Sequence, residues 1–162
     1  MRNFKKSFII LFCLVAYSCG YQLQDTSSLA VKTGKVFIET NDPYSPFYKV
    51  LKNTMKINKI SFSESRSSAD TIIIINDADF KERVVTVSSS NYPKEYEINL
   101  EVTWSLTHQD QIIIEKAKYT EPGDYSFDRN VILGKVNESN FIKESLAEQV
   151  VEKIILRMSE VT

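Results

Sequence analysis

Histidine and cysteine are scarce in this chain of 162 residues, which contains one histidine, two cysteines, four glycines and four prolines. A single histidine cannot form the histidine-rich ligand sets of catalytic zinc sites. The sequence also lacks a glycine-rich phosphate-binding loop and a G-x-S-x-G nucleophile motif. These absences argue against nucleotide-dependent, hydrolytic and metal-dependent enzymes.

The remaining candidates for acid–base catalysis are the lone histidine and a few carboxylates. His108 falls in a polar segment that we expect to be a hairpin loop, where a single histidine is usually solvated. Carboxylates that alternate with apolar residues usually lie on the wet face of a strand. They are Asp77, Asp79, Glu95, Glu97 and Glu101. We therefore expect no catalysis, and a periplasmic hydrolase is the least supported alternative.

Charge is distributed unevenly, although the net charge is only −1. Three of the 20 basic residues and none of the 21 acidic residues lie in residues 1–18, so the rest of the chain has a net charge of −4. A mildly acidic body argues against nucleic acid as a partner, because sequence-independent binding relies on clustered lysine and arginine.

Residues 7–17 (SFIILFCLVAY) form the most apolar segment and follow a basic N-terminus. A bilayer span needs about 20 apolar residues, so this segment has the length of the apolar centre of an export signal. Cleavage before Cys13 would place the bulky Phe12 at the position before the cut, whereas cleavage before Cys19 places the small Ser18 there. We therefore expect cleavage before Cys19.

The tetrapeptide AYSC (residues 16–19) resembles a bacterial lipobox, in which the cysteine is acylated and becomes the first residue, although its first two residues depart from the usual form. The alternative is a plain signal peptide that leaves Cys19 as a free thiol, because loss of Cys13 removes any disulfide partner. We expect acyl chains such as palmitate on Cys19, which would anchor the chain permanently. Gly20 after the cysteine resembles the enterobacterial pattern for the outer membrane.

The mature chain is expected to form a lipidated tether over residues 19–34 and a single α+β domain over residues 35–162. Ser45 and Pro46 are typical of a helix N-cap and first position. Residues 95–106 alternate between apolar and polar side chains, which predicts a long, half-buried strand. The expected elements are a strand at 35–39, a helix from 46 to about 57, strands at 71–75, 83–88, 95–106 and 111–120, a loop at 121–136 and a helix at 139–158. Residues 83–88 could also continue the strand at 71–75 after a bend.

This order predicts a two-layer sandwich of the α+β class. Its largely antiparallel sheet has four to five strands, and the two helices pack on one face.

Five segments, in the same order, resemble the LPS-assembly lipoprotein LptE family. They are CGYQLQDT (19–26), the strand at 36–39, NDPYSP (41–46), KEYEINLEV (94–102) and LGKVNE (133–138). The resemblance implies an outer-membrane lipoprotein that plugs and helps assemble an LptD-type barrel and binds lipopolysaccharide (LPS), with no reaction catalysed and no cofactor. The alternative is a stand-alone lipoprotein that serves another envelope complex as a ligand-binding or structural module, with residues 131–133 as a docking point.

Two groups of basic residues are candidates for binding the phosphates of LPS. Lys49, Lys52, Lys56 and Lys59 are spaced to share one face of the first helix. The family resemblance implies Lys135 and a basic position before the EY strand, where this chain has serines at 88–90. Lys94, or Lys81 with Arg83, would substitute there. The polar face of residues 95–105 suits the polar lumen of a barrel, or simply meets water.

Overall fold

The computed structural model describes residue 30, residues 32–126 and residues 132–161, with side chains described at 30, 32–126 and 138–161. The elements in chain order are β1 (Lys35–Thr40), α3 (Pro46–Ile57), β2 (Ser61–Phe62), the 3-10 turn η1 (Arg66–Ser68), β3 (Thr71–Val87), β4 (Pro93–His108), β5 (Gln111–Ser126) and α4 (Ile132–Val161). The five strands form one sheet in the order β2-β1-β3-β4-β5.

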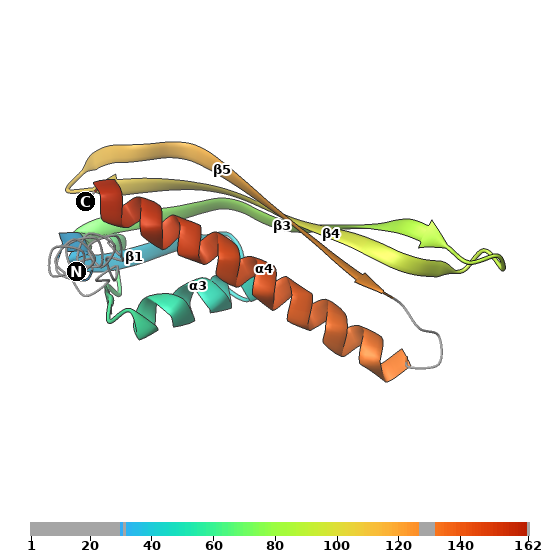
Figure 1. Ribbon diagram of the computed structural model, residues 1–162. Coiled ribbons are helices and arrows are strands. Elements are labelled where there is room, and N and C mark those ends of the chain that lie inside the picture. Colours follow the sequence, from blue (N-terminus) through green and yellow to red (C-terminus); the bar gives the residue numbers. More distant parts are fainter. Residues whose placement is uncertain (1–29, 31, 127–131, 162) are drawn as a thin grey trace, which may run out of the picture.

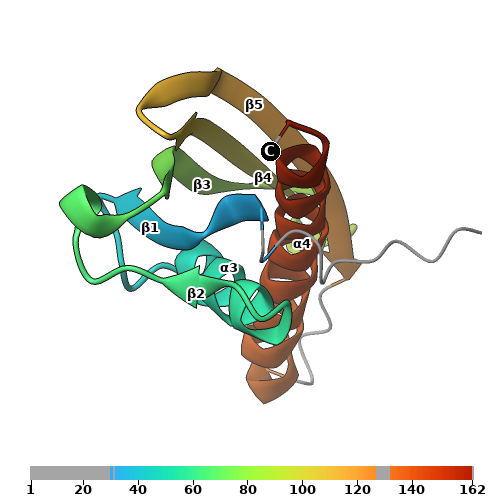
Figure 2. The same cartoon turned by 90° about the vertical axis from the view of Figure 1, so that its left-hand side faces the viewer.

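The sheet is mixed and mostly antiparallel. β1 runs parallel to both β2 and β3, whereas β3, β4 and β5 form an antiparallel meander. Both helices cover the same face of the sheet, and no helix of the described residues lies on the opposite face of β3, β4 and β5 (Figure 1; the end-on view in Figure 2 separates the two layers). The predicted α+β two-layer fold is confirmed.

The core lies between the helices and the central strand β4. The even-numbered residues of β4 from Ile98 to Leu106 are fully buried, while the residues between them face outward. α3 contributes Phe47, Leu51 and Met55 to this core, and α4 contributes an apolar stripe from Leu146 to Met158. The alternation and the helical spacing read from the sequence are therefore confirmed.

The start of α3 follows its local sequence. Ser45 Oγ accepts a hydrogen bond from the Tyr48 backbone N–H at 3.1 Å, and Pro46 occupies the first helical position. Asn58 caps the C-terminal end, and Lys59 adopts a left-handed conformation with φ of 59°. Lys59 therefore lies beyond the helix, which corrects its expected place on the helical face.

β3 is a single strand, which confirms the continuous alternative for residues 71–75 and 83–88. The expected loop at 121–136 is wrong at both ends, because β5 extends to Ser126 and α4 begins at Ile132 instead of residue 139. Pro122 is tolerated because β5 is an edge strand with no further ladder to supply. A Cβ on Gly123 would lie 3.2 Å from Ile142 Cγ2, so this glycine lets α4 approach β5 closely.

Tyr125 also holds the end of β5 in the sheet. Its ring stacks on Tyr96 with centroids 5.1 Å apart, and its hydroxyl donates to Glu82 of β3. Burial, together with this hydrogen bond to Glu82, raises the pKa of the Tyr125 phenol well above its usual value. The hydroxyl therefore remains a donor at every physiological pH.

The chain enters the sheet through a set of contacts around Gly34. The Lys35 backbone N–H donates to Asp70 Oδ2 at 2.8 Å, and Thr71 Oγ1 donates to the Thr33 carbonyl at 2.6 Å. Gly34 has φ of +61°, and a Cβ there would lie 2.4 Å from Asp70 Oδ2. This junction therefore needs glycine. Within the described residues no helix is both long and apolar enough to cross a membrane.

Gly34→Ala is expected to lower the free energy of unfolding by about 1–3 kcal/mol, because it forces an L side chain into a left-handed conformation and displaces Asp70. Urea unfolding followed by circular dichroism measures the change. Asn53→Ala on the exposed side of α3 is the control and should stay within about 0.5 kcal/mol of the wild type. Equal stability of the Gly34 variant and the wild type would contradict the prediction.

Candidate functional site

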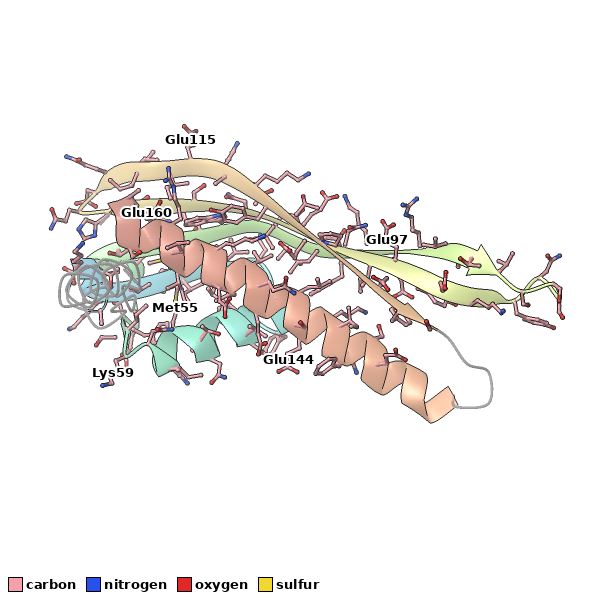
Figure 3. All side chains as sticks on the ribbon, in the orientation of Figure 1. Met55, Lys59, Glu97, Glu115, Glu144 and Glu160 are labelled. Carbon is pink, nitrogen blue, oxygen red and sulfur yellow. The ribbon has the colours of Figure 1, made fainter. Side chains whose placement is uncertain are left out.

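The side of β3, β4 and β5 that faces away from the helices is polar, and we call it the open face. The strand registers place Asp79 opposite Glu101, Arg83 opposite Glu97 and Thr103 opposite Lys118. Its residues are Asp77, Asp79, Lys81, Arg83, Glu95, Glu97, Asn99, Glu101, Thr103, Ser105, Lys118, Thr120 and Asp124. Figure 3 shows Glu97 on this side of the sheet and Glu144 on the helix side. Six carboxylates and three basic side chains make this face acidic.

Arg83 and Glu97 form a bidentate ion pair across β3 and β4. Arg83 Nε lies 3.0 Å from Glu97 Oε1 and its terminal nitrogen lies 2.7 Å from Oε2. Asn99 Nδ2 donates to Glu97 Oε1 at 2.7 Å. The hydrogen bonds from Arg83 and Asn99 lower the pKa of Glu97, and the contact with Glu97 raises the pKa of Arg83.

Glu101 links the three strands of the open face. Its two carboxylate oxygens accept from Lys81 of β3 at 3.0 Å and from Lys118 of β5 at 2.8 Å. Hydrogen bonds from Lys118 and then Lys81 lower the pKa of Glu101, and the contact with Glu101 raises the pKa of Lys81. Lys81 and Arg83, both predicted to bind LPS, are therefore held by carboxylates of their own sheet.

The candidate acid–base carboxylates do not form a catalytic arrangement. Glu97 and Glu101 lie in ion pairs, Glu95 accepts from Thr86 Oγ1 at 2.5 Å, and Asp77 and Asp79 are exposed. No group of metal-ligating side chains occurs among the described residues. His108 ends β4, where its Nδ1 lies 2.8 Å from Thr71 Oγ1, so its role is structural and it is not simply solvated.

The lysines of α3 lie in the helix layer, away from the open face. Lys49 and Lys56 are exposed, whereas Lys52 is half-buried. Lys52 Nζ lies 5.6 Å from the centroid of the Tyr48 ring, and Lys56 lies in the last turn, where a cation stabilises the helix dipole. These two lysines thus have structural roles within α3.

The β3–β4 ribbon is the pair of strands that extends beyond β1, and its far end lies where β3 ends at Val87 and β4 begins at Pro93. This end combines a cation with exposed apolar side chains. Lys94 is exposed, and it forms no ion pair within the described residues. Val84, Val85 and Val87 are 45–56% exposed on the neighbouring strand. The structure therefore separates the predicted LPS-binding residues into three groups, on α3, on the open face and at this ribbon end.

Several predicted features lie outside the described residues. They include Cys19, the signal segment and most of the tether, so the proposed domain boundaries stay predictions. Lys135 falls within α4, but its side chain is not among those described. Of the expected docking segment at residues 131–133, Ile132 and Leu133 belong to α4 and not to a loop.

Sequence reasoning placed Asn99 on the polar face of residues 95–105 but missed Lys118 as a member of the open-face network. The signal available was weak, because Lys118 alternates with apolar residues along residues 111–120 in the same way as any polar residue of a strand. Only the register between β4 and β5 places Lys118 beside Glu101.

Glu101→Gln is expected to make the free energy of unfolding less sensitive to acid than it is in the wild type. The pKa of Glu101 in the folded chain is lowered below its usual value of 4.5, so its contribution is present above that pH and is lost as the pH falls through the folded pKa. The difference in Tm between wild type and variant should thus shrink from pH 7 to pH 3. Glu115→Gln, an exposed carboxylate without an ion pair in the described strands, should show no such trend. A difference independent of pH would refute the assignment.

Comparisons with known proteins agree on a family. The family described as "LptE: Lipopolysaccharide-assembly" matches residues 33–158. An LPS-assembly lipoprotein of Photorhabdus laumondii is 22% identical over 150 residues, which cover 91% of this chain and 81% of the relative. The corresponding Yersinia pestis protein is 22% identical over 162 residues, covering 91% of this chain and 72% of the relative. These relatives are named as assembly lipoproteins and not as enzymes.

Solved structures show the same fold. The rare lipoprotein B from Shewanella oneidensis aligns with a TM-score of 0.65 at 13% identity and covers 78% of this chain and 94% of its own. A minor lipoprotein from Acinetobacter baumannii aligns with a TM-score of 0.62 at 14% identity, covering 79% and 92%. Because the matching family spans nearly all of the described residues, this chain belongs to the LptE family of lipopolysaccharide-assembly proteins.

Proposed function

We propose that the mature chain is held in the outer membrane by a lipid on Cys19 and fills the lumen of an LptD-type barrel. There it helps the barrel to assemble and binds LPS on its way to the outer leaflet. Family membership supports the role in LPS assembly, and the relatives from Photorhabdus and Yersinia are themselves LPS-assembly lipoproteins. The barrel, the anchor and the contacts with LPS are the parts proposed here.

The open face is the observation that carries the proposal for a barrel. The lumen of an outer-membrane barrel is polar, so a plug must present polar groups to it. Glu97 and Glu101 already have cationic partners within the sheet, which reduces the cost of removing this face from water. Asp77 and Asp79 lie near Lys81 but form no salt bridge among the described residues, so we propose that they remain for contacts with the wall.

A lipid anchor on Cys19 agrees with the way the chain enters the domain. The residues before β1 enter the sheet at Gly34, where Thr33 is hydrogen-bonded to Thr71 at the start of β3 and Lys35 to Asp70 just before it. A lipid on Cys19 would therefore be coupled to the folded domain at this junction. The exposed end of the β3–β4 ribbon lies at the other end of the sheet (Figure 1).

Lys94 is the described lysine best placed for a phosphate of LPS. Lys81 and Arg83 are occupied by Glu101 and Glu97, and Lys52 and Lys56 have structural roles on α3. Lys94 has no ion pair with another described residue and lies beside exposed valines, so it offers both a cation and an apolar surface to an amphiphilic lipid. Lys135, on α4, is the second residue proposed from the family resemblance.

Cys19→Ala is expected to weaken membrane association of the mature chain without abolishing its complex with the barrel, because a lodged plug is also held by the lumen. Membranes are extracted in mild detergent, and the proteins that travel with the chain are identified and counted by mass spectrometry. The wild type should carry lipid on Cys19 and recover one barrel per chain.

A wild-type chain recovered as a free monomer would overturn the barrel assignment. Stoichiometric recovery with a different envelope complex would support the alternative of a lipoprotein that serves another machine. An unmodified amino terminus on native material would remove the lipid anchor from the proposal.

Lys94→Glu is expected to lower the affinity for LPS about tenfold, because it places a carboxylate where a lipid phosphate would bind. Binding of purified LPS to the mature chain is measured by fluorescence titration at constant salt. Lys56→Glu makes the same change of charge on α3 and should alter the affinity less than twofold. Equal effects of the two variants would assign the loss to net charge and refute the role of Lys94.

A further inference from the structure

The two lysines proposed for LPS belong to elements that are distant in sequence. Lys94 is the second residue of β4, and Lys135 lies in the first turn of α4. Figure 1 shows the start of α4 and the far end of the β3–β4 ribbon at the same end of the molecule. One phosphorylated ligand can use both lysines without first ordering the chain only if the fold holds these two elements at a fixed separation.

Tyr125, near the end of β5, contacts both of these elements. Its ring stacks on Tyr96 of β4, with centroids 5.1 Å apart and ring planes inclined by 7°. Its hydroxyl is hydrogen-bonded to the side chain of Ser139 on α4. Tyr96 lies two residues after Lys94 along β4. Ser139 lies about one helical turn after Lys135 along α4, so Tyr125 meets each element within one structural repeat of a proposed LPS-binding lysine.

The hydroxyl of Tyr125 has a fixed direction of hydrogen bonding. It donates its proton to Glu82 of β3, so it accepts the proton of Ser139 Oγ. Burial, and then the bond to Glu82, raises the pKa of the phenol, so the proton stays on the hydroxyl. The side chain of Tyr125 is 4% exposed and reaches from β5 across β4 to β3.

The neighbouring contacts of α4 are apolar or long. Ile142 packs against Gly123 of β5. Lys143 Nζ lies 6.0 Å from the centroid of the Phe80 ring on β3. Such contacts bring the helix close to the sheet but are tolerant of small slides and rotations, whereas a hydrogen bond is directional. The Tyr125 hydroxyl is therefore suited to fix the orientation of the N-terminal half of α4.

We propose that Tyr125 is a positioning residue for LPS, which keeps the start of α4 and the start of β4 at the separation where one LPS molecule contacts Lys94 and Lys135 together. This inference rests on the function proposed above and deepens it. Tyr125 is buried and acts through the two lysines. Cations that are held in place before the ligand arrives bind it more tightly than cations that binding must order.

Phenylalanine at position 125 separates packing from positioning, because it keeps the ring on Tyr96 and removes the hydroxyl. Tyr125→Phe should weaken the binding of purified LPS about fivefold. Affinity is measured by fluorescence titration of the mature chain in mild detergent at constant salt. Tyr44→Phe removes the hydroxyl of a residue that is 82% exposed and should alter the affinity less than twofold.

Ser139 supplies the matching change on α4. Ser139→Ala removes the donor and should weaken LPS binding about as much as Tyr125→Phe does. Ser139→Thr keeps a hydroxyl at the same place and should stay within about twofold of the wild type. Tyr125→Phe combined with Ser139→Ala should be no weaker than either change alone, because both remove the same hydrogen bond.

The Lys94→Glu variant distinguishes positioning from general stability. Once Lys94 is lost, the separation of the two lysines no longer matters, so Tyr125→Phe should alter the remaining affinity less than twofold. A residue that acted only by stabilising the fold would lower the affinity by the same factor with Lys94 present or absent.

Backbone hydrogen exchange in the absence of LPS tests the position of the helix directly. Tyr125→Phe should speed exchange severalfold at residues 138–145 of α4, where the helix loses its polar link to the sheet. Exchange from Val150 to Ile155, where the helix faces the core, should not change.

The outcomes separate this inference from the proposed function. Wild-type affinity for LPS in Tyr125→Phe would overturn the inference and leave the proposed function intact. So would an equal loss of affinity in the Lys94→Glu background, or unchanged exchange at residues 138–145. A wild-type chain that does not bind LPS would overturn the LPS-binding part of the proposed function, and this inference with it.

Discussion

Burial of one side of β4 is the constraint on which the rest of the structure depends. Ile98, Leu100, Val102, Trp104 and Leu106 are all 0% exposed. At about 1.5–3 kcal/mol for each large apolar side chain, burial of this row contributes substantially to the stability of the domain. It requires a helix layer on one side, and α3 and α4 supply that layer with Phe47, Leu51 and the stripe that begins at Leu146. It also fixes the register of the neighbouring strands, since a slip by one residue would turn the row outward.

The same alternation leaves the other side of the sheet with polar side chains, and no element of the described residues covers them. The charged side chains on this side are paired with one another. Glu101 forms ion pairs with Lys81 and Lys118 on the neighbouring strands, and Glu97 is bound by Arg83 and Asn99. Such a face is stable in water and is also suited to contact with a polar protein surface. A member of an LPS-assembly family can therefore be built on an ordinary half-buried sheet.

Local signals were enough to predict α3 and β4. Ser45 and Pro46 determine where the helix begins, and the alternation of residues 95–106 describes one strand by itself. The end of β5 and the start of α4 could not be predicted, because Pro122 and Gly123 are strand breakers unless the strand lies at an edge and a helix packs closely against it. The ion pairs depend on register, which relates residues far apart in sequence. The family could be identified because it depends on the order of several short motifs and not on any one contact.

The junction at Gly34 has a mechanical consequence. β1 follows directly after Gly34 and lies parallel to β3, with Val36 through Thr40 beside Thr71 through Ile75. A force applied at the N-terminal end of β1, along the strand axis, therefore acts in shear on all the hydrogen bonds between β1 and β3. These hydrogen bonds share the force instead of opening one after another. The hydrogen bonds of Thr71 with Thr33 and of Asp70 with Lys35 add two further links at the residue where the force enters. Tension that enters the domain at this junction would in this way pass from β1 into β3 and would not peel β1 from its N-terminal end.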